Sequence, residues 1–171
     1  MSVTAGVLGL ALAIMPAQGG GDTAAAALVQ QLRHPNPGVR GMAAEKLGEM
    51  GPAARSAVKP LAAALADEDL NVRYWAARAL GRMAEQAGEA VPALVGARRT
   101  TLPGRGLQGP MRYYADVRAV SAEALGQIGA PARMALPALK EALSDEDRSV
   151  RDAAAEAVKR VEGADKRGGR K

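Results

Sequence analysis

The sequence contains no cysteine and no phenylalanine, it has a single histidine, and only 2% of its residues are aromatic. Without cysteine there can be no disulfide bond, no cysteine-ligated zinc site and no thiol nucleophile. With one histidine, a histidine zinc site or a Ser–His catalytic triad is not expected. No run of strand length alternates apolar and polar residues, so a β-sheet has no candidate strands. The remaining class is all-α.

What the chain does contain is alanine and leucine, with 48% hydrophobic residues in a total of 171. This length corresponds to one domain that is large enough to bury most of its apolar surface. Because alanine side chains cannot fill wide gaps, helices with this composition must pack closely.

The net charge of +5 is unevenly distributed. Arginines concentrate in the segment 98–112 and bases in the C-terminal tail 163–171, whereas the rest of the chain has more acids than bases. A nucleic-acid-binding domain usually has a basic face throughout, so nucleic acid is not the expected partner. We expect the tail 163–171 to be a disordered, solvated end.

The N-terminal segment 1–20 has an apolar run from Val7 to Met15, followed by Pro16 and small residues. This pattern resembles a secretory signal peptide and favours export over a cytoplasmic location, although the segment lacks the usual basic residue before the run. The alternatives are a wrongly chosen start codon and an apolar N-terminal segment that caps the fold. The run is too short for a transmembrane helix.

Internal repetition is the main feature of the sequence. The dipeptide Val–Arg recurs at residues 39, 72, 117 and 150, at intervals of 33, 45 and 33. Positions 3, 4, 8 and 11 after each valine are apolar or small in every copy, which is the spacing of one stripe on an α-helix. In order, the columns are Met42, Trp75, Val120 and Ala153; Ala43, Ala76, Ser121 and Ala154; Leu47, Leu80, Leu125 and Val158; and Met50, Met83, Ile128 and Val161. We expect these columns, Trp75 included, to form the core.

A shorter helix precedes each stripe, with apolar pairs Ala25/Leu28, Val58/Leu61, Val91/Leu94 and Leu136/Leu139. The predicted helices are near 23–33 and 39–50, 55–66 and 72–86, 89–99 and 114–129, and 132–143 and 150–162, separated by Gly- and Pro-containing breaks. Gly38, Asn71, Asp116 and Ser149 are the predicted N-caps of the second helices. The repeat domain then spans 22–162, in units 22–51, 52–87, 88–129 and 130–162.

These residues resemble HEAT repeats, specifically the HEAT-like repeat of the phycobilisome-lyase type. The resemblance rests on segments such as Leu65 to Arg73 followed by Ala76 to Gly81, and it covers about 25–162. It implies a right-handed α-solenoid of four helical pairs. It also implies a ladder in which an acid in each turn holds the arginine six residues later. Asp67 with Arg73 and Asp145 with Arg151 match this pattern, whereas Arg40 and Arg118 lack the corresponding acid.

Two surfaces are candidates for binding a partner. The third unit has an insertion loop at 100–112 that contains Arg105 and leads to Arg112, Tyr113 and Tyr114, where basic side chains lie next to amphipathic rings. The other surface is the solvent-facing side of the second helix of unit two. Tyr74, Arg78 and Arg82 lie there, at positions where the other units have small or acidic residues. The competing interpretation of 100–114 is a flexible insertion without a binding role, whose tyrosines pack against the solenoid.

We expect no catalytic, cofactor or metal site, because the acidic residues lie in solvated turns rather than facing each other. The favoured function is a protein-interaction or scaffold module that binds another protein. Two alternatives remain open. One is a nucleic-acid-binding HEAT-like protein, and the other is an accessory subunit resembling bilin lyase subunits.

Overall fold

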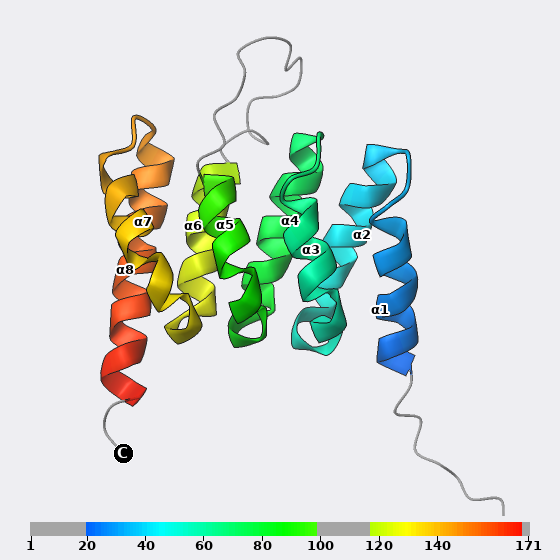
Figure 1. The fold of residues 1–171 in the computed structure, drawn as a ribbon, viewed down its shortest axis with the longest axis horizontal. Helices are drawn as coiled ribbons and strands as arrows, with labels where there is room; N and C mark the ends of the chain where they lie inside the picture. The colour runs from blue at the N-terminus through cyan, green and yellow to red at the C-terminus, as the bar shows by residue number, and fades with distance from the viewer. Residues whose placement is uncertain (1–19, 99–116, 169–171) are drawn as a thin grey trace, which may run out of the picture.

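Helices account for all regular structure in residues 20–98 and 117–168, the part of the chain that the computed structural model describes (Figure 1). They form consecutive pairs. The pairs are α1 (Gly20–Gln31) with α2 (Pro37–Met50), α3 (Val58–Ala64) with α4 (Leu70–Arg82), α5 (Val91–Arg98) with α6 (Val117–Ile128), and α7 (Leu136–Glu141) with α8 (Arg148–Gly168). The predicted all-α solenoid of four helical pairs is confirmed.

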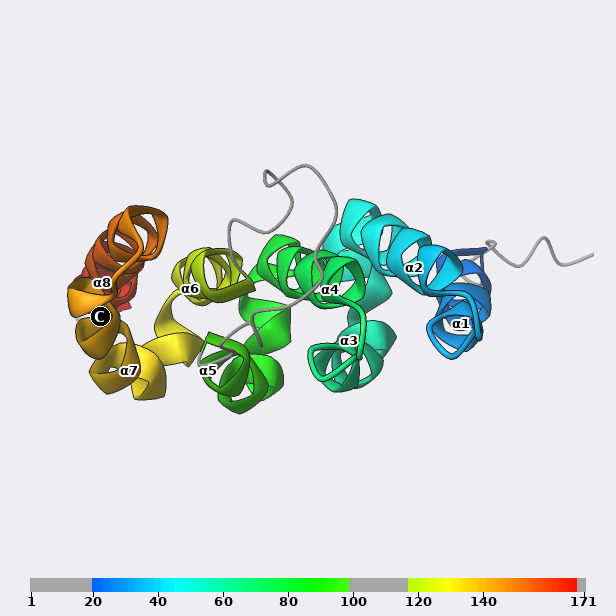
Figure 2. The same cartoon turned by 90° about the horizontal axis from the view of Figure 1, so that it is seen from above.

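The helices form two layers, which are clearest from above (Figure 2). The second helices α2, α4, α6 and α8 lie side by side in one layer, and the first helices α1, α3, α5 and α7 form the other. The second helices contact each other extensively, whereas the first helices are farther apart. The array therefore bends, and the second helices line its concave side.

The predicted core columns are largely buried. Leu47, Leu80 and Leu125 are fully buried, and Val158, on the last helix, is half-buried. Met42 is the clear exception, because its side chain is 57% exposed. Its column lies toward the concave surface, and the prediction that Met42 is a core residue is wrong.

Short 3-10 helices join the units: η1 (Gly51–Ala57), η2 (Ala84–Ala90) and η4 (Ala130–Ala135). The sequence predicted breaks at the start of η1 and η4, and at Gly88 inside η2, where an α-helix had been expected to run to residue 86. Because a 3-10 helix repeats every three residues, alanines three apart face the same side. Ala54 and Ala57, and equally Ala87 and Ala90, are fully buried in this way. A fourth short segment, η5 (Ala142–Ser144), ends the helix α7.

The N-caps lie two residues earlier than predicted. Asn36, Asp69 and Asp147 each accept a hydrogen bond from the amide two residues later, that is from Gly38, Asn71 and Ser149. The predicted caps Gly38, Asn71 and Ser149 are therefore donors within the first turn, and the prediction was wrong for them. Short Asn and Asp side chains favour this geometry, because they reach their own backbone. Asp116 lies outside the described residues.

The last helix is longer than predicted. Helix α8 continues to Gly168, whereas the sequence placed the end at 162 and a disordered tail from 163. Residues 163–168 are therefore helical.

Glycine and alanine bring the second helices into near backbone contact. A Cβ added to Gly48 would lie 2.8 Å from Cα of Ala79, one on Gly81 would lie 3.0 Å from Cα of Ala124, and one on Gly126 would lie 2.8 Å from Cα of Ala157. In each case the glycine lies nine residues after the valine of its own Val–Arg pair. It contacts the alanine that lies seven residues after the valine of the next unit's Val–Arg pair. At the two ends of the array, lysines replace these small residues. Lys46 of α2 occupies the alanine position and Lys159 of α8 the glycine position, and both are exposed. No helix could approach these faces as closely.

Replacing Gly126 with alanine tests this contact. Helix propensity alone favours alanine by about 1 kcal/mol, but overpacking against a neighbouring backbone typically costs about 1–3 kcal/mol. We expect Gly126→Ala to lower the free energy of unfolding in urea by about 1–2 kcal/mol. Gly163→Ala, in the same layer but with no atom within 4 Å of the added Cβ, should raise it by about 0.5–1 kcal/mol. Equal effects of the two substitutions would refute the close contact.

Ala84 adopts a backbone conformation that alanine avoids. Its φ is 51°, whereas the equivalent residues at the other two unit junctions are Gly51 (φ 55°) and Gly129 (φ 73°). An L-residue with a side chain is strained in this region by about 1–2 kcal/mol, because its Cβ approaches the following carbonyl oxygen. Glycine is the residue type that fits this turn.

We therefore expect Ala84→Gly to stabilise the protein by about 0.5–1 kcal/mol, even though glycine usually destabilises. The reverse change, Gly129→Ala, should destabilise it by about 1 kcal/mol or more. Thermal unfolding of the two variants provides the check. A lower melting temperature for Ala84→Gly would contradict the strained turn.

Candidate functional site

The main aromatic cluster of the described residues lies on α4, on the concave side. The Tyr74 and Trp75 rings pack edge to face, with centroids 5.3 Å apart. Arg78 lies one turn further along the helix. It donates a hydrogen bond of 2.9 Å from Nη1 to the Tyr74 hydroxyl oxygen, and its Cζ lies 5.6 Å from the Trp75 ring centre. The cation thus holds both rings in place, and Tyr74, Trp75 and Arg78 form one preordered patch.

Trp75 belongs to this patch as well as to the core. Its ring packs against buried residues but is only partly buried, and it covers Gly41 of the preceding unit, where an added Cβ would lie 3.7 Å from the indole Cδ1. The sequence placed Trp75 wholly in the core, because it occupies the column of Val120 and Ala153. Its size was the available signal, since an indole is too large to be enclosed between helices this close.

Arg82 extends the patch along α4. Arg78 and Arg82 are both exposed and border a small hollow of about 170 Å³ between α4 and α6, which is also lined by Val120, Glu123, Ala124 and Gln127. The structure thus brings Tyr74, Arg78 and Arg82 together on one helix face, next to an acidic residue of the following unit. The other predicted contact residues, Arg105, Arg112, Tyr113 and Tyr114, lie outside the described residues.

A larger hollow of about 550 Å³ follows between α6 and α8. Acidic side chains line it, namely Glu123, Asp152 and Glu156, but Glu156 pairs with Arg160 at 2.9 Å and Asp152 pairs with Arg148 at 3.4 Å. The concave face therefore changes from basic and aromatic over α4 to acidic and largely neutralised over α8.

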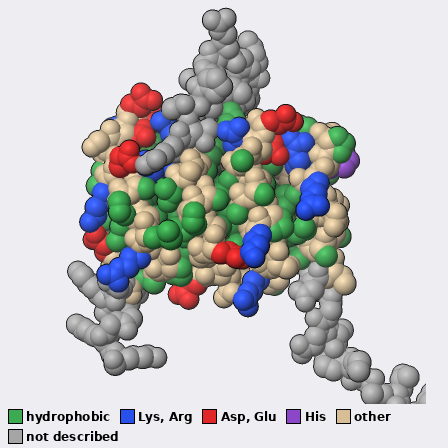
Figure 3. Space-filling view, in the orientation of Figure 1, with side chains coloured by type: hydrophobic (Ala, Val, Ile, Leu, Met, Phe, Trp, Pro, Cys, Tyr) green, Lys and Arg blue, Asp and Glu red, His purple; other side chains and the backbone are tan. Residues whose placement is uncertain are grey.

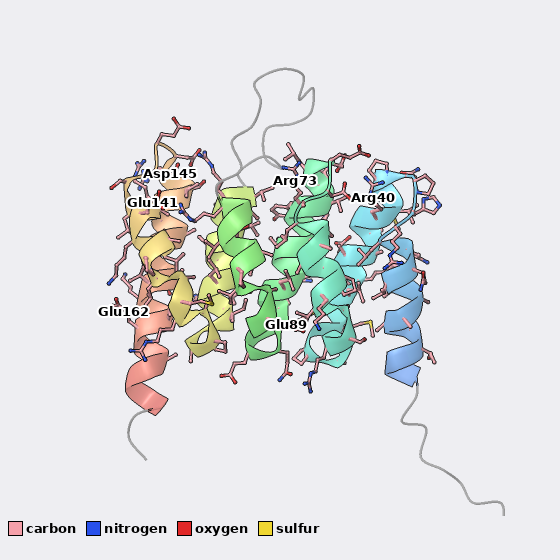
Figure 4. The ribbon with its side chains drawn as sticks, in the orientation of Figure 1. Arg40, Arg73, Glu89, Glu141, Asp145 and Glu162 are labelled. Carbon is pink, nitrogen blue, oxygen red and sulfur yellow. The ribbon has the colours of Figure 1, made fainter. Side chains whose placement is uncertain are left out.

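A ladder of arginines runs along the edge where each first helix turns into its second helix (Figure 4). Arg40 is the best-formed rung. Its Nε and Nη2 donate to the two carboxylate oxygens of Asp67, each at 2.8 Å, and its Nη1 donates to the carbonyl oxygens of His34 and Pro35 at 2.9 and 3.0 Å. The hydrogen bonds that the Arg40 guanidinium donates to Asp67 raise its pKa above its already high usual value. The side chains are only 9% and 13% exposed.

The ladder crosses between units. Arg40 belongs to the first pair of helices and Asp67 to the turn of the second, while Arg118 of α6 approaches Asp145 of the fourth unit at 3.5 Å. Arg73 and Arg151 instead donate to the main-chain carbonyl oxygens of Asp67 and Asp145, in their own turns. The predicted contacts of Asp67 with Arg73 and of Asp145 with Arg151 are present, but each uses the main-chain carbonyl oxygen of the aspartate and not its carboxylate. Arg40 and Arg118, predicted to lack an acid, have one.

The geometry of the turn explains this correction. An arginine six residues after the acid reaches back past the start of its own helix into the turn, where it meets the main-chain carbonyl groups of Asp67 or Asp145. The carboxylate of Asp67 points away from it and also accepts the Asp69 amide at 2.9 Å. The carboxylate of Asp67 therefore accepts from Arg40 of the preceding unit. The sequence alone did not reveal how the two units align.

The comparison with known families agrees with this architecture. The sequence matches the model of HEAT repeats over residues 25–105 and 113–167. The chain belongs to the HEAT repeat family. No curated protein matches the sequence.

Solved structures share the HEAT fold of this chain. Crystal structures of three engineered proteins align over 82, 82 and 81% of the chain, with TM-scores of 0.63, 0.61 and 0.58 and identities of 23, 24 and 24%. The alignments cover 63, 69 and 37% of those proteins, so the chain spans less than two thirds of the first. At these identities the likeness concerns the fold alone.

Two further polar contacts stabilise the HEAT array. Arg98, buried to 5% exposure at a position where other units have leucine, donates from Nη2 to Glu141 at 2.9 Å and so links α5 to α7. Asp147 accepts hydrogen bonds from the Ser149 hydroxyl and amide, both at 2.7 Å, and these lower the pKa of its carboxyl group. Because this pKa is lower in the folded than in the unfolded chain, Asp147 stabilises the fold at neutral pH, and the contribution is lost as the pH falls through the folded value.

The described residues contain no group of three or more His, Asp or Glu side chains positioned to hold a metal ion. None of the helices in the described ranges is both long and apolar enough to cross a membrane.

The inter-unit rung can be tested with Asp67→Asn, which keeps the shape but removes the charge. The change leaves the largely buried Arg40 guanidinium without its carboxylate, so we expect a loss of about 2 kcal/mol or more in the free energy of unfolding. Glu89→Gln is the control, because Glu89 pairs with Lys59 at 3.8 Å on the exposed surface and should cost less than about 0.5 kcal/mol. Similar small losses for both variants in urea unfolding would refute the rung.

Proposed function

We propose that this HEAT chain is a non-catalytic protein-interaction module, and that the patch of Tyr74, Trp75 and Arg78, with Arg82, contacts the partner protein. HEAT repeats generally mediate protein–protein interaction or scaffolding. The solenoid fold is typically non-catalytic. The concave side offers the partner a broad surface on adjacent helices.

The observation that carries the proposal is the aromatic and cationic patch on the concave side, where Arg78 is exposed and Tyr74 is partly buried, although the column of Tyr74, predicted to face solvent, is buried at Gly41 and Ala119. The positions equivalent to Tyr74 in the other units are Gly41, Ala119 and Asp152, and those equivalent to Arg78 are Glu45, Glu123 and Glu156. Stacking of units does not require an aromatic ring or a positive charge there. Tyrosine, tryptophan and arginine are also the residue types that contribute most to protein interfaces.

The order within the patch also favours binding. Since the Arg78–Tyr74 hydrogen bond and the edge-to-face ring contact already fix three side chains, less conformational entropy is lost when a partner binds. Met42, exposed on the neighbouring helix, adds an adaptable apolar side chain to the same side.

The acidic residues of the concave side argue against nucleic acid. Glu45, Glu123 and Glu156 recur in the column of Arg78 and would repel phosphates. The accessory-subunit alternative is supported by the repeat type alone, which occurs on a fold that hosts many functions. The loop 100–114 remains a second proposed contact.

The test is affinity capture from an extract of the organism that encodes the protein. We compare the wild type with Tyr74→Ala/Arg78→Ala/Arg82→Ala and with the control Arg55→Ala/Lys59→Ala, which removes the same amount of positive charge on the exposed surface. We expect at least one protein to be captured by the wild type and by the control, and to be depleted tenfold or more with the triple variant. Unchanged capture by the triple variant, or no specific capture by the wild type, would contradict the proposal.

Trp75 supplies a direct readout, because it is the one tryptophan of the chain. Binding at the patch should change its fluorescence when the captured protein is added in purified form. A variant without residues 100–112 separates the two surfaces, since binding through the patch should survive the deletion. An unaltered tryptophan signal in a saturated complex would argue against the patch.

A further inference from the structure

Two arginines of the ladder, Arg73 and Arg151, have no carboxylate partner among the described residues, and of these two only Arg73 is followed by another unit. Arg40, Arg73 and Arg118 occupy the same column of their units. Arg40 and Arg118 each approach a carboxylate of the next turn, at 2.8 and 3.5 Å. Arg73 donates from Nε to the carbonyl oxygen of Asp67, in its own turn, but it forms no ion pair with any residue in 20–98 or 117–168. The Nη1 and Nη2 atoms of Arg73 therefore have no carboxylate partner among the described residues.

The third unit has no acid at the position that supplies this carboxylate in the second and fourth units. Asp67 and Asp145 lie five residues before the valine of their Val–Arg pair, but the residue at this position in the third unit is Arg112. An arginine cannot supply a carboxylate to another arginine. Asp67 itself is not available, because both of its carboxylate oxygens are bound by Arg40.

A groove begins next to Arg73. It has a volume of about 400 Å³ and lies between α3 and α5, on the side of the first helices. Its other lining residues are Ala62, Leu65, Ala66, Ala93, Gly96 and Ala97, all uncharged and mostly small. A Cβ added to Gly96 would meet no atom within 4 Å, so the groove is open there. Figure 3 shows this convex face, on which hydrophobic side chains spread between scattered charges.

We propose that Arg73 and this groove bind an acidic segment of a partner protein, with an aspartate or glutamate carboxylate in the guanidinium fork and a neighbouring apolar side chain against the alanines. The partner would supply to Arg73 a carboxylate like the one that the turn Asp67–Glu68–Asp69–Leu70 supplies to Arg40 within the chain. A bidentate arginine–carboxylate pair is directional, and the adjacent uncharged groove adds apolar contact area. The site is separate from the Tyr74–Arg78 patch, which lies on the concave side.

The test uses the full chain and a synthetic probe, the acetylated and amidated peptide Leu-Ala-Asp-Glu-Asp-Leu-Asn, which copies residues 65–71. In NMR titrations we expect saturable shifts of the Arg73 Nε–Hε signal and of the Ala62, Ala66, Ala93 and Ala97 methyl signals. A peptide with asparagine for each aspartate and glutamine for the glutamate should bind at least fivefold more weakly. Shifts confined to Arg78 and Arg82, or no saturable shift, would overturn the proposal.

Two kinds of variant distinguish binding from a structural role of Arg73. Arg73→Lys keeps the charge but not the fork, and we expect it to weaken peptide binding at least threefold. Gly96→Leu fills the groove without touching Arg73, and it should weaken binding at least fivefold while the melting temperature does not fall. Arg55→Gln, on the exposed surface, is the matched control and should bind as the wild type does. Undiminished binding by Gly96→Leu would refute the groove, and undiminished binding by Arg73→Lys would refute the fork.

Discussion

Near-backbone contact between neighbouring second helices is the constraint on which the rest of the structure depends. Gly48, Gly81 and Gly126 leave room for the alanine of the next unit, so α2, α4, α6 and α8 approach closely while the first helices stay farther apart. The difference in spacing bends the array. It forms the concave side that presents Tyr74 and Arg78, and it opens the groove between α3 and α5 on the other side. Larger residues in the glycine column would remove both features.

The arginine ladder fixes the units in a second way, at the edge where the helices turn. Each arginine of the Val–Arg pair holds carbonyl groups of its own turn or a carboxylate of the next turn, and Arg40 holds both. Alanine-rich helix faces can shift along each other, because small side chains interlock weakly. A directional, bidentate contact such as Arg40–Asp67 has only one register. We infer that the apolar contacts bring the units together and that the ladder sets how they align.

Much of the fold could be predicted from the sequence, because the Val–Arg repeat and its apolar columns follow the helical period. What the sequence could not give was the partner of each polar group. Asp67 and Arg73 lie six residues apart and share a turn, yet the carboxylate of Asp67 belongs to Arg40, which is 27 residues away. Trp75 shows a similar limit, since its column is buried in later units but lies near the surface here. The 3-10 helices escaped prediction because glycine and proline, at the starts of η1 and η4 and at Gly88 within η2, indicate only that an α-helix is interrupted.

The most direct test of the central claim is a measurement of the distance between the backbones of α6 and α8 in solution. Nuclear Overhauser effects between the Hα protons of Gly126 and the Hα and methyl protons of Ala157 should be strong, because a Cβ on Gly126 would lie only 2.8 Å from the Ala157 Cα. Similar effects should join Gly48 to Ala79 and Gly81 to Ala124. If these signals are absent and the glycine protons instead contact water or large side chains, the close packing on which the concave side and the ladder depend does not exist.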